Sequence, residues 1–138
     1  MSRNSSIDLN IINLNIELNR VNYKKTSNES GQFDVNMNQS VSLVEIRENA
    51  FVIDVTRKIN IEPKSIFELE VSVLLTFMVS EESLEILQGD EIEEYLKANM
   101  NDFVENSPAG SILSLLISQI TGSCGNVPLV TPPNLKQN

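Results

Sequence analysis

The segment from Ile66 to Val79 constrains the fold of this chain more than any other stretch. Its apolar residues recur at every second position from Phe67 to Val79, while the alternate positions begin with two glutamates and then become mixed. Successive side chains of a β-strand point to opposite faces of the sheet, so a period of two predicts a long strand. One face of this strand is fully apolar and must be covered, whereas the other suits contact with water.

The composition indicates a single globular domain without an obvious reaction centre. The chain has 138 residues, which is long enough to bury a core, and it contains no histidine. Histidine is the commonest general base and metal ligand, so we predict no enzyme, no catalytic set, no metal site and no cofactor. The single cysteine, Cys124, cannot form an internal disulfide and is interpreted as a loop thiol.

The charge and hydropathy of the chain bound its partners. A net charge of −9 repels phosphate backbones, so we expect no nucleic-acid partner. The acidity agrees with simple solubility, and the alternative is a docking face for a basic partner. The N-terminal residues lack an apolar signal region and no long apolar run follows, so we expect a cytoplasmic protein without direct membrane insertion.

Three further strands are predicted before the strand at Ile66–Val79. They cover Ile7–Leu18, Gln32–Ile46 and Ala50–Ile61, where apolar residues again alternate with polar ones. The phase of the alternation changes at Ile11-Ile12 and again near Leu43-Val44, and each change predicts a β-bulge. Because short polar turns separate the strands, we predict a four-stranded antiparallel meander.

Arg57 stands on the inward phase of the third predicted strand. Its side chain either extends along the sheet end to reach water or pairs with a carboxylate, and we favour the first interpretation.

The period changes to that of helices after Val79. Asp90 is a good N-cap for a helix whose apolar residues lie on one face, and the acids after it lack the spacing of a calcium-binding loop. Ser107-Pro108 predicts the start of a second helix. From Ile112 to Ile120 this helix is apolar around much of its circumference, so we predict that it contacts another copy of the chain.

The order of these segments resembles the SecB export chaperones over about residues 7–135. NIINLNIEL is similar to the first strand of that family, and SIFELEVSVLLTFMV is similar to a strand with a Phe-x-x-Glu-Val core, here Phe67, Glu70 and Val71. The most specific match is the family's proline, aliphatic helix, glycine turn and closing Pro-x-Asn motif, which corresponds to Pro108, Gly122, Pro128, Leu129, Pro132, Pro133, Asn134 and Leu135.

The resemblance implies an α+β fold in which a four-stranded antiparallel sheet carries a C-terminal helical layer on one face. It implies one SecB-like domain over residues 1–138, with the sheet at 7–79, the crossover and helices at 80–122, and a Pro-rich extended tail at 123–138. The family assembles as a dimer of dimers, so a homo-oligomer, either dimer or tetramer, is expected. The interface candidates lie on the first strand and the last helix: Ile11, Ile12, Ile112, Leu113, Leu116, Ile117 and Ile120.

The resemblance also implies two kinds of partner. Unfolded or partly folded polypeptides would bind in apolar grooves, for which the candidate residues are Met37, Val41, Tyr95, Phe103, Leu129 and Val130. The family's secretion motor docks through a basic tail onto acids of the outer sheet face, and Glu68 and Glu70 are the candidates here. The corresponding first-strand positions carry neutral Asn15 and Asn19, so this docking patch is at most half present.

Two functions follow from these expectations. The first is an ATP-independent holdase for protein export or for a dedicated client such as an antitoxin, because SecB-like chaperones of toxin–antitoxin systems resemble this chain as well. The second is an adaptor of the same fold that binds one specific partner and has no general chaperone activity.

Overall fold

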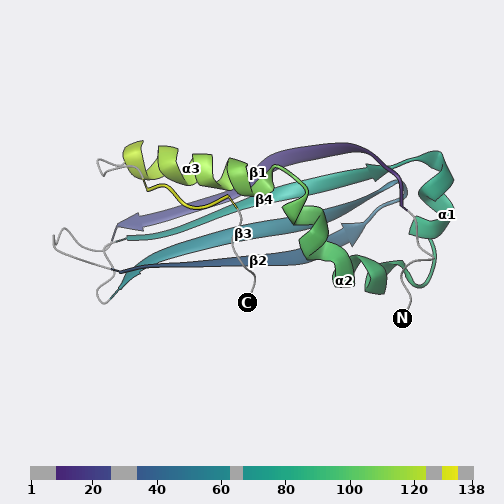
Figure 1. Ribbon diagram of the computed structural model, residues 1–138, viewed down its shortest axis with the longest axis horizontal. Coiled ribbons are helices and arrows are strands. Elements are labelled where there is room, and N and C mark those ends of the chain that lie inside the picture. Colours follow the sequence, from purple (N-terminus) through teal and green to yellow (C-terminus); the bar gives the residue numbers. More distant parts are fainter. Residues whose placement is uncertain (1–8, 26–33, 63–66, 124–128, 134–138) are drawn as a thin grey trace.

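The computed structural model describes residues 9–25, 34–62, 67–123 and 129–133 (Figure 1). Four long strands are followed by helices. The strands are β1 (Ile11–Lys25), β2 (Asp34–Ile46), β3 (Ala50–Glu62) and β4 (Phe67–Val79). The helices are a 3-10 turn (Glu81–Ser83), α1 (Leu84–Leu87), α2 (Ile92–Glu105) and α3 (Ala109–Ser123).

The four strands form one antiparallel sheet, and α2 and α3 lie on the same face of it (Figure 1). We call this covered face the helix side and the opposite face the open face. The odd-numbered residues of β4, from Phe67 to Val79, are all buried on the helix side. The predicted four-stranded antiparallel sheet with a C-terminal helical layer is therefore confirmed.

The strand order corrects the predicted meander. The order is β1-β4-β3-β2, so β1 pairs with β4 at the far edge and not with its neighbour in sequence, β2. The eight residues 26–33 between the two strands can reach about 26 Å, while three strand spacings amount to only about 14 Å. The connection is thus long enough to cross the sheet, and β1 places its apolar row beside the most apolar strand.

The bulges occur where the apolar phase changes in the sequence. The register shifts between Ile11 and Asn13 in β1, and between Leu43 and Glu45 in β2, which confirms both predicted bulges. A third shift, between Leu18 and Arg20, was not predicted. After this shift, residues 20–25 still pair with β4. Strand β1 therefore continues to Lys25, beyond the predicted end at Leu18.

The core lies between the sheet and the two longer helices. Phe51 of β3 stacks on Phe77 of β4 at 5.0 Å between ring centroids, and Phe103 of α2 contacts them at 5.1 and 5.4 Å. Leu113 and Ile117 of α3 pack into the same core with 0% exposure. Helix α2 thus adds Phe103 to an aromatic cluster and also buries Ile92, Leu96 and Val104, while α3 contributes aliphatic residues alone.

The helix starts agree with the sequence in one case and differ in the other. Ser107 accepts a hydrogen bond from the backbone N–H of Ala109 at 3.2 Å, which confirms the predicted start at Ser107-Pro108. Helix α2 begins at Ile92 with Glu91 as its N-cap, and no side chain caps it. Asp90 is therefore one position too early to be the cap.

Arg57 corrects both sequence interpretations of its side chain. It is 0% exposed, so it does not extend to water, and none of the described residues offers it a carboxylate partner. Its neutral partners lie on β2, α3 and the segment 129–133.

Candidate functional site

A groove on the helix side, between β1 and α2, is the first candidate site. Its volume is about 400 Å³, within the roughly 300–1,000 Å³ typical of ligand sites. Apolar side chains and a polar rim line it together. The apolar residues are Ile11, Leu14, Phe77, Tyr95 and Phe103, and the polar ones are Asn99, Asp102, Asn106 and Ser107.

The groove forms because one face of β1 and one face of α2 line opposite sides of a gap. Leu14 of β1 stands opposite Phe77 of β4 in register, so both side chains lie on the helix side. Tyr95, Asn99 and Asp102 recur at helical spacing, so they share one face of α2, and the C-cap residue Asn106 continues that face. Helix α2 packs toward β2 and α3 packs on β4. Beside β1, this packing leaves a hollow with an apolar floor.

The polar rim of the groove is ordered. The side chain of Asn99 donates a hydrogen bond to the backbone carbonyl of Tyr95 at 2.8 Å, one turn earlier. An apolar floor with a few fixed polar groups at its edge suits apolar side chains of a polypeptide, whose backbone can hydrogen-bond to the rim. The site offers binding by burial, and no arrangement of reactive groups is apparent in it.

The predicted client residues fall in two places. The structure brings Tyr95 and Phe103 together in the groove. Met37 and Val41 are half-buried on the helix side of β2, and Leu129 and Val130 belong to the segment after α3. The client-binding role of all six residues stays a prediction. Leu14 and Phe77 line the groove but were not predicted, because strand register and not sequence spacing brings them to α2.

The predicted oligomer residues also divide. Leu113 and Ile117 are interior residues of the single chain, so they offer no surface to another copy. Ile112, Leu116 and Ile120 are partly exposed and pack against the core. Ile11 lines the groove, whereas Ile12, the extra residue at the bulge, is 61% exposed. On β1 and α3, three further apolar residues were not predicted and are exposed: Leu18, Val21 and Leu115.

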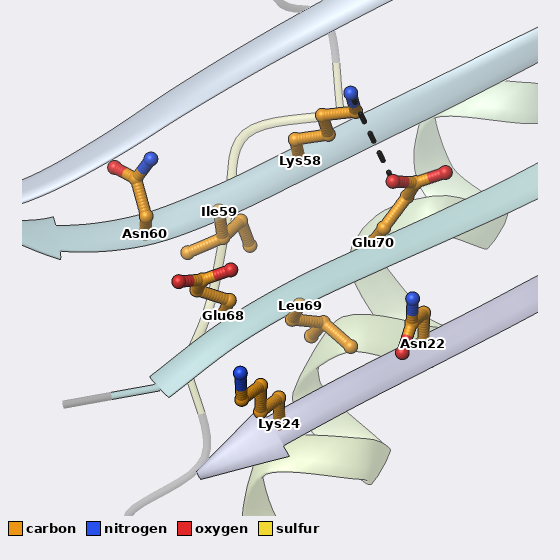
Figure 2. A pocket seen from close by; sticks show the side chains of 8 residues that line it. All are labelled: Asn22, Lys24, Lys58, Ile59, Asn60, Glu68, Leu69 and Glu70. Atoms are coloured by element: carbon orange, nitrogen blue, oxygen red, sulfur yellow. Dashed lines mark ion pairs between the residues drawn. The ribbon is translucent and has the colours of Figure 1, made fainter. Parts of the chain in front are cut away.

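The predicted docking acids lie on the open face, in a shallow hollow of about 220 Å³ (Figure 2). The carboxylate of Glu70 forms an ion pair with Arg20 of β1 at 2.6 Å and a longer one with Lys58 of β3 at 3.9 Å. Lys24 of β1 stands opposite Glu68 in register. Cross-strand pairs of opposite charge are favourable. A basic partner would therefore compete with cations of this chain, and the docking role of Glu68 and Glu70 stays a prediction.

A polar network occupies the middle of the open face. The side chain of Asn19, at the third bulge, donates hydrogen bonds to Asp54 at 3.3 Å and to Ser72 at 3.2 Å. Asp54 also accepts from Ser72 at 3.1 Å and from Thr56 at 2.6 Å. Asn19 thus holds three strands together at a position where the resemblance implied an acid for partner docking.

Residues 9–25, 34–62, 67–123 and 129–133 contain no group of three or more His, Cys, Asp or Glu side chains that could hold a metal ion. In the same ranges, no helix has both the length and the apolar character needed to cross a bilayer. Cys124 lies outside the described residues.

Comparison with known proteins was informative only at the level of structure. No family model and no curated protein matches the sequence. The fold is similar to the SecB-like chaperone Rv1957 of Mycobacterium tuberculosis, whose structure contains a ChAD peptide from the Rv1956 HigA1 antitoxin. The TM-score is 0.58, and the match covers 95% of this chain and 91% of that one. The fold is SecB-like. At 14% sequence identity the match shows the fold alone.

Proposed function

We propose that this protein is an ATP-independent chaperone that holds unfolded polypeptide segments in the groove between β1 and α2. The observation that carries the proposal is the groove itself, an apolar floor with a polar rim on the helix side of a SecB-like fold. The neighbour's bound antitoxin peptide supports a polypeptide as the ligand.

The physical basis of the proposed binding is burial of apolar surface. Each client side chain that becomes fully buried contributes about 1.5–3 kcal/mol before the costs of association. One or two such residues do not offset those costs, so a client must offer several apolar residues over an extended segment. Because apolar contact is non-directional, many unfolded sequences would qualify. The binding itself requires no nucleotide and no catalytic residue.

The client can be general or dedicated. A holdase for exported proteins would bind many unfolded chains, whereas a chaperone for an antitoxin would act on one. We propose that the protein acts in the cytoplasm as a homo-oligomer, whose contacts include the exposed apolar residues Ile12, Leu18, Val21 and Leu115. A secretion motor remains a proposed partner through Glu68 and Glu70, in competition with Arg20 and Lys58.

A matched pair of charge substitutions tests the groove. Leu14→Asp places a carboxylate on the apolar floor, while Asn15→Asp adds the same charge one residue later, on the open face. Binding of a fluorescently labelled, permanently unfolded polypeptide is measured by anisotropy without nucleotide, after circular dichroism has shown that both variants fold. We expect Leu14→Asp to weaken binding at least about tenfold, or roughly 1.4 kcal/mol, and Asn15→Asp to change it less than about twofold. Equal binding by the two variants would remove the groove as the site.

The adaptor function is the second candidate, because the SecB-like neighbour was solved with a peptide of one named antitoxin. A chaperone with general activity delays aggregation of several unrelated unfolded proteins. An adaptor would delay none of them and would bind one partner through the same groove.

A further inference from the structure

The segment 129–133 returns along α3 after that helix ends (Figure 1). The backbone N–H of Leu129 donates to the hydroxyl of Thr121 near the end of α3 at 2.8 Å. Two residues later, the hydroxyl of Ser114 in the middle of α3 donates to the carbonyl of Thr131 at 2.7 Å. The segment thus runs antiparallel to α3, toward the start of that helix, and is held at both places by hydroxyl groups.

The guanidinium of Arg57, on β3, binds the last residues of this segment, Thr131–Pro133. Its Nη1 lies 2.9 Å from both the Thr131 hydroxyl and the Pro132 carbonyl, and its Nη2 lies 3.2 Å from the Pro133 carbonyl. The same guanidinium donates to Gln39 of β2 at 2.7 and 3.0 Å. One side chain therefore joins β3, β2 and the returning segment.

The attachment is made of neutral acceptors around a buried cation. Arg57 is completely buried, yet every described partner of its guanidinium is an amide, a hydroxyl or a backbone carbonyl. Desolvation by burial lowers the pKa of Arg57 to about 10, so the side chain is still charged at neutral pH. A cation buried without an opposite charge is costly. When the segment opens, the guanidinium returns to water, and its hydration offsets part of the free energy that is lost with these hydrogen bonds.

Apart from the Thr131 hydroxyl, the segment offers Arg57 only groups that every polypeptide carries. Residues 132 and 133 are both prolines, which have no backbone N–H, and they serve Arg57 only through their carbonyls. Every peptide backbone carries the same acceptor. Val130 is 80% exposed, so the burial that the segment would lose on opening is mainly that of Leu129, which is half-buried, and of Thr131, which is buried.

The attachment point lies beside two predicted client residues. Gln39 and Arg57 are opposite each other in register, and the neighbouring cross-strand pairs on the same face are Met37 with Ile59 and Val41 with Val55. Met37 and Val41 are only half-buried. An opened segment would leave the Gln39–Arg57 pair to another chain, whose apolar side chains could then contact Met37 and Val41 on either side.

We propose that residues Leu129–Pro133 form a displaceable strap, that Arg57 is its catch, and that a bound polypeptide takes the place of the strap over the Gln39–Arg57 pair. This inference rests on the proposed polypeptide-binding function and extends the binding surface from the β1–α2 groove to β2 and β3. The strap then sets how much of that surface a client can reach.

Hydrogen exchange of the Leu129 amide reports the strap directly, since this N–H is bonded to Thr121 only while the strap is closed. The full-length protein is followed by NMR, with and without reduced, carboxymethylated α-lactalbumin as the unfolded polypeptide. We expect the bound polypeptide to speed exchange of Leu129 at least about fivefold. Unchanged or slower exchange, with the polypeptide bound, would overturn the strap proposal and leave the groove proposal standing.

Thr131→Val tests the catch without removing Arg57 or much volume. Loss of the hydroxyl contact to the guanidinium should speed exchange of Leu129 up to about tenfold in the absence of any client. Because the open state is then more populated, the unfolded polypeptide should bind several-fold more tightly. Weaker binding would overturn the proposal, since it would mean that the strap is part of the site and does not compete for it.

Two more variants keep the test decisive. Ser114→Ala removes a second attachment point and should act in the same direction if Thr131→Val does not fold. Ser111→Ala, an exposed position one turn earlier on α3, is the matched control and should leave Leu129 exchange unchanged. Absence of polypeptide binding in the wild-type protein, together with faster exchange in Thr131→Val, would overturn the proposed function and the displacement step, while the role of Arg57 as the catch would stand.

Discussion

A double-mutant cycle between Phe51 and Phe103 tests whether α2 sits on the sheet as described. The two rings meet edge-to-face at 5.1 Å between centroids, and Phe103 is the residue of α2 that joins the aromatic core to the groove floor. An aromatic pair of this geometry contributes about 0.5–1.5 kcal/mol beyond the area it buries. Leucine at either position keeps an apolar side chain and loses this term.

The free energy of unfolding is measured by urea denaturation for the wild type, Phe51→Leu, Phe103→Leu and the double variant. Each single change should cost about 1 kcal/mol, and the double variant should cost roughly 1 kcal/mol less than their sum. Phe51→Leu combined with Phe67→Leu is the control cycle, because these two residues are far apart. Phe51 stands opposite Phe77 in register, and Phe67 lies ten residues along β4 from Phe77, or about 33 Å. That cycle should be additive within about 0.5 kcal/mol. Additivity in both cycles would mean that α2 does not dock through Phe103, and the groove as described would be lost.

Three further predictions concern other parts of the molecule. Arg57→Met should lower the free energy of unfolding by about 2 kcal/mol, because buried acceptors lose their donor. The difference from wild type should stay constant from pH 6 to 8.5, since the pKa of Arg57 falls only to about 10, and urea curves at several pH values check both points. Glu70→Gln should cost at most about 1 kcal/mol and less in 1 M salt, as expected for a partly exposed ion pair with Arg20. A cost that did not depend on salt would contradict the ion-pair account. Leu115→Asp should weaken self-association in light scattering without loss of monomer stability, because Leu115 is 58% exposed on α3. An unchanged mass would remove this surface from the interface.

Local patterns predicted much of the fold. Alternation located all four strands, and the two phase changes located two bulges, because side-chain direction along a strand is a local property. The neighbour of β1 was not predictable in this way. Whether it pairs with β2 or β4 depends on where an eight-residue connection leads, and short-range sequence signals do not encode that choice.

The site depends on contacts that are distant in sequence. Arg57 was ambiguous because its partners Pro132 and Pro133 lie 75 and 76 residues away. Glu70 seemed available to a basic partner because Arg20 lies on another strand, 50 residues earlier. Tyr95 and Phe103 were recognisable as apolar positions of a helix, yet only the strand register shows that Leu14 completes the groove with them. None of these features could be predicted without the register of the strands or the position of the segment 129–133.

Photo-crosslinking from the groove tests the central claim most directly. A photoreactive amino acid is placed at Asn99 on the groove rim and, as the control, at the exposed Asn36 on the open face of β2, and each protein is irradiated with an unfolded polypeptide. The proposed function predicts strong crosslinks from position 99 and few from position 36, with or without ATP. Crosslinks from position 36 alone, or a requirement for ATP at position 99, would contradict it.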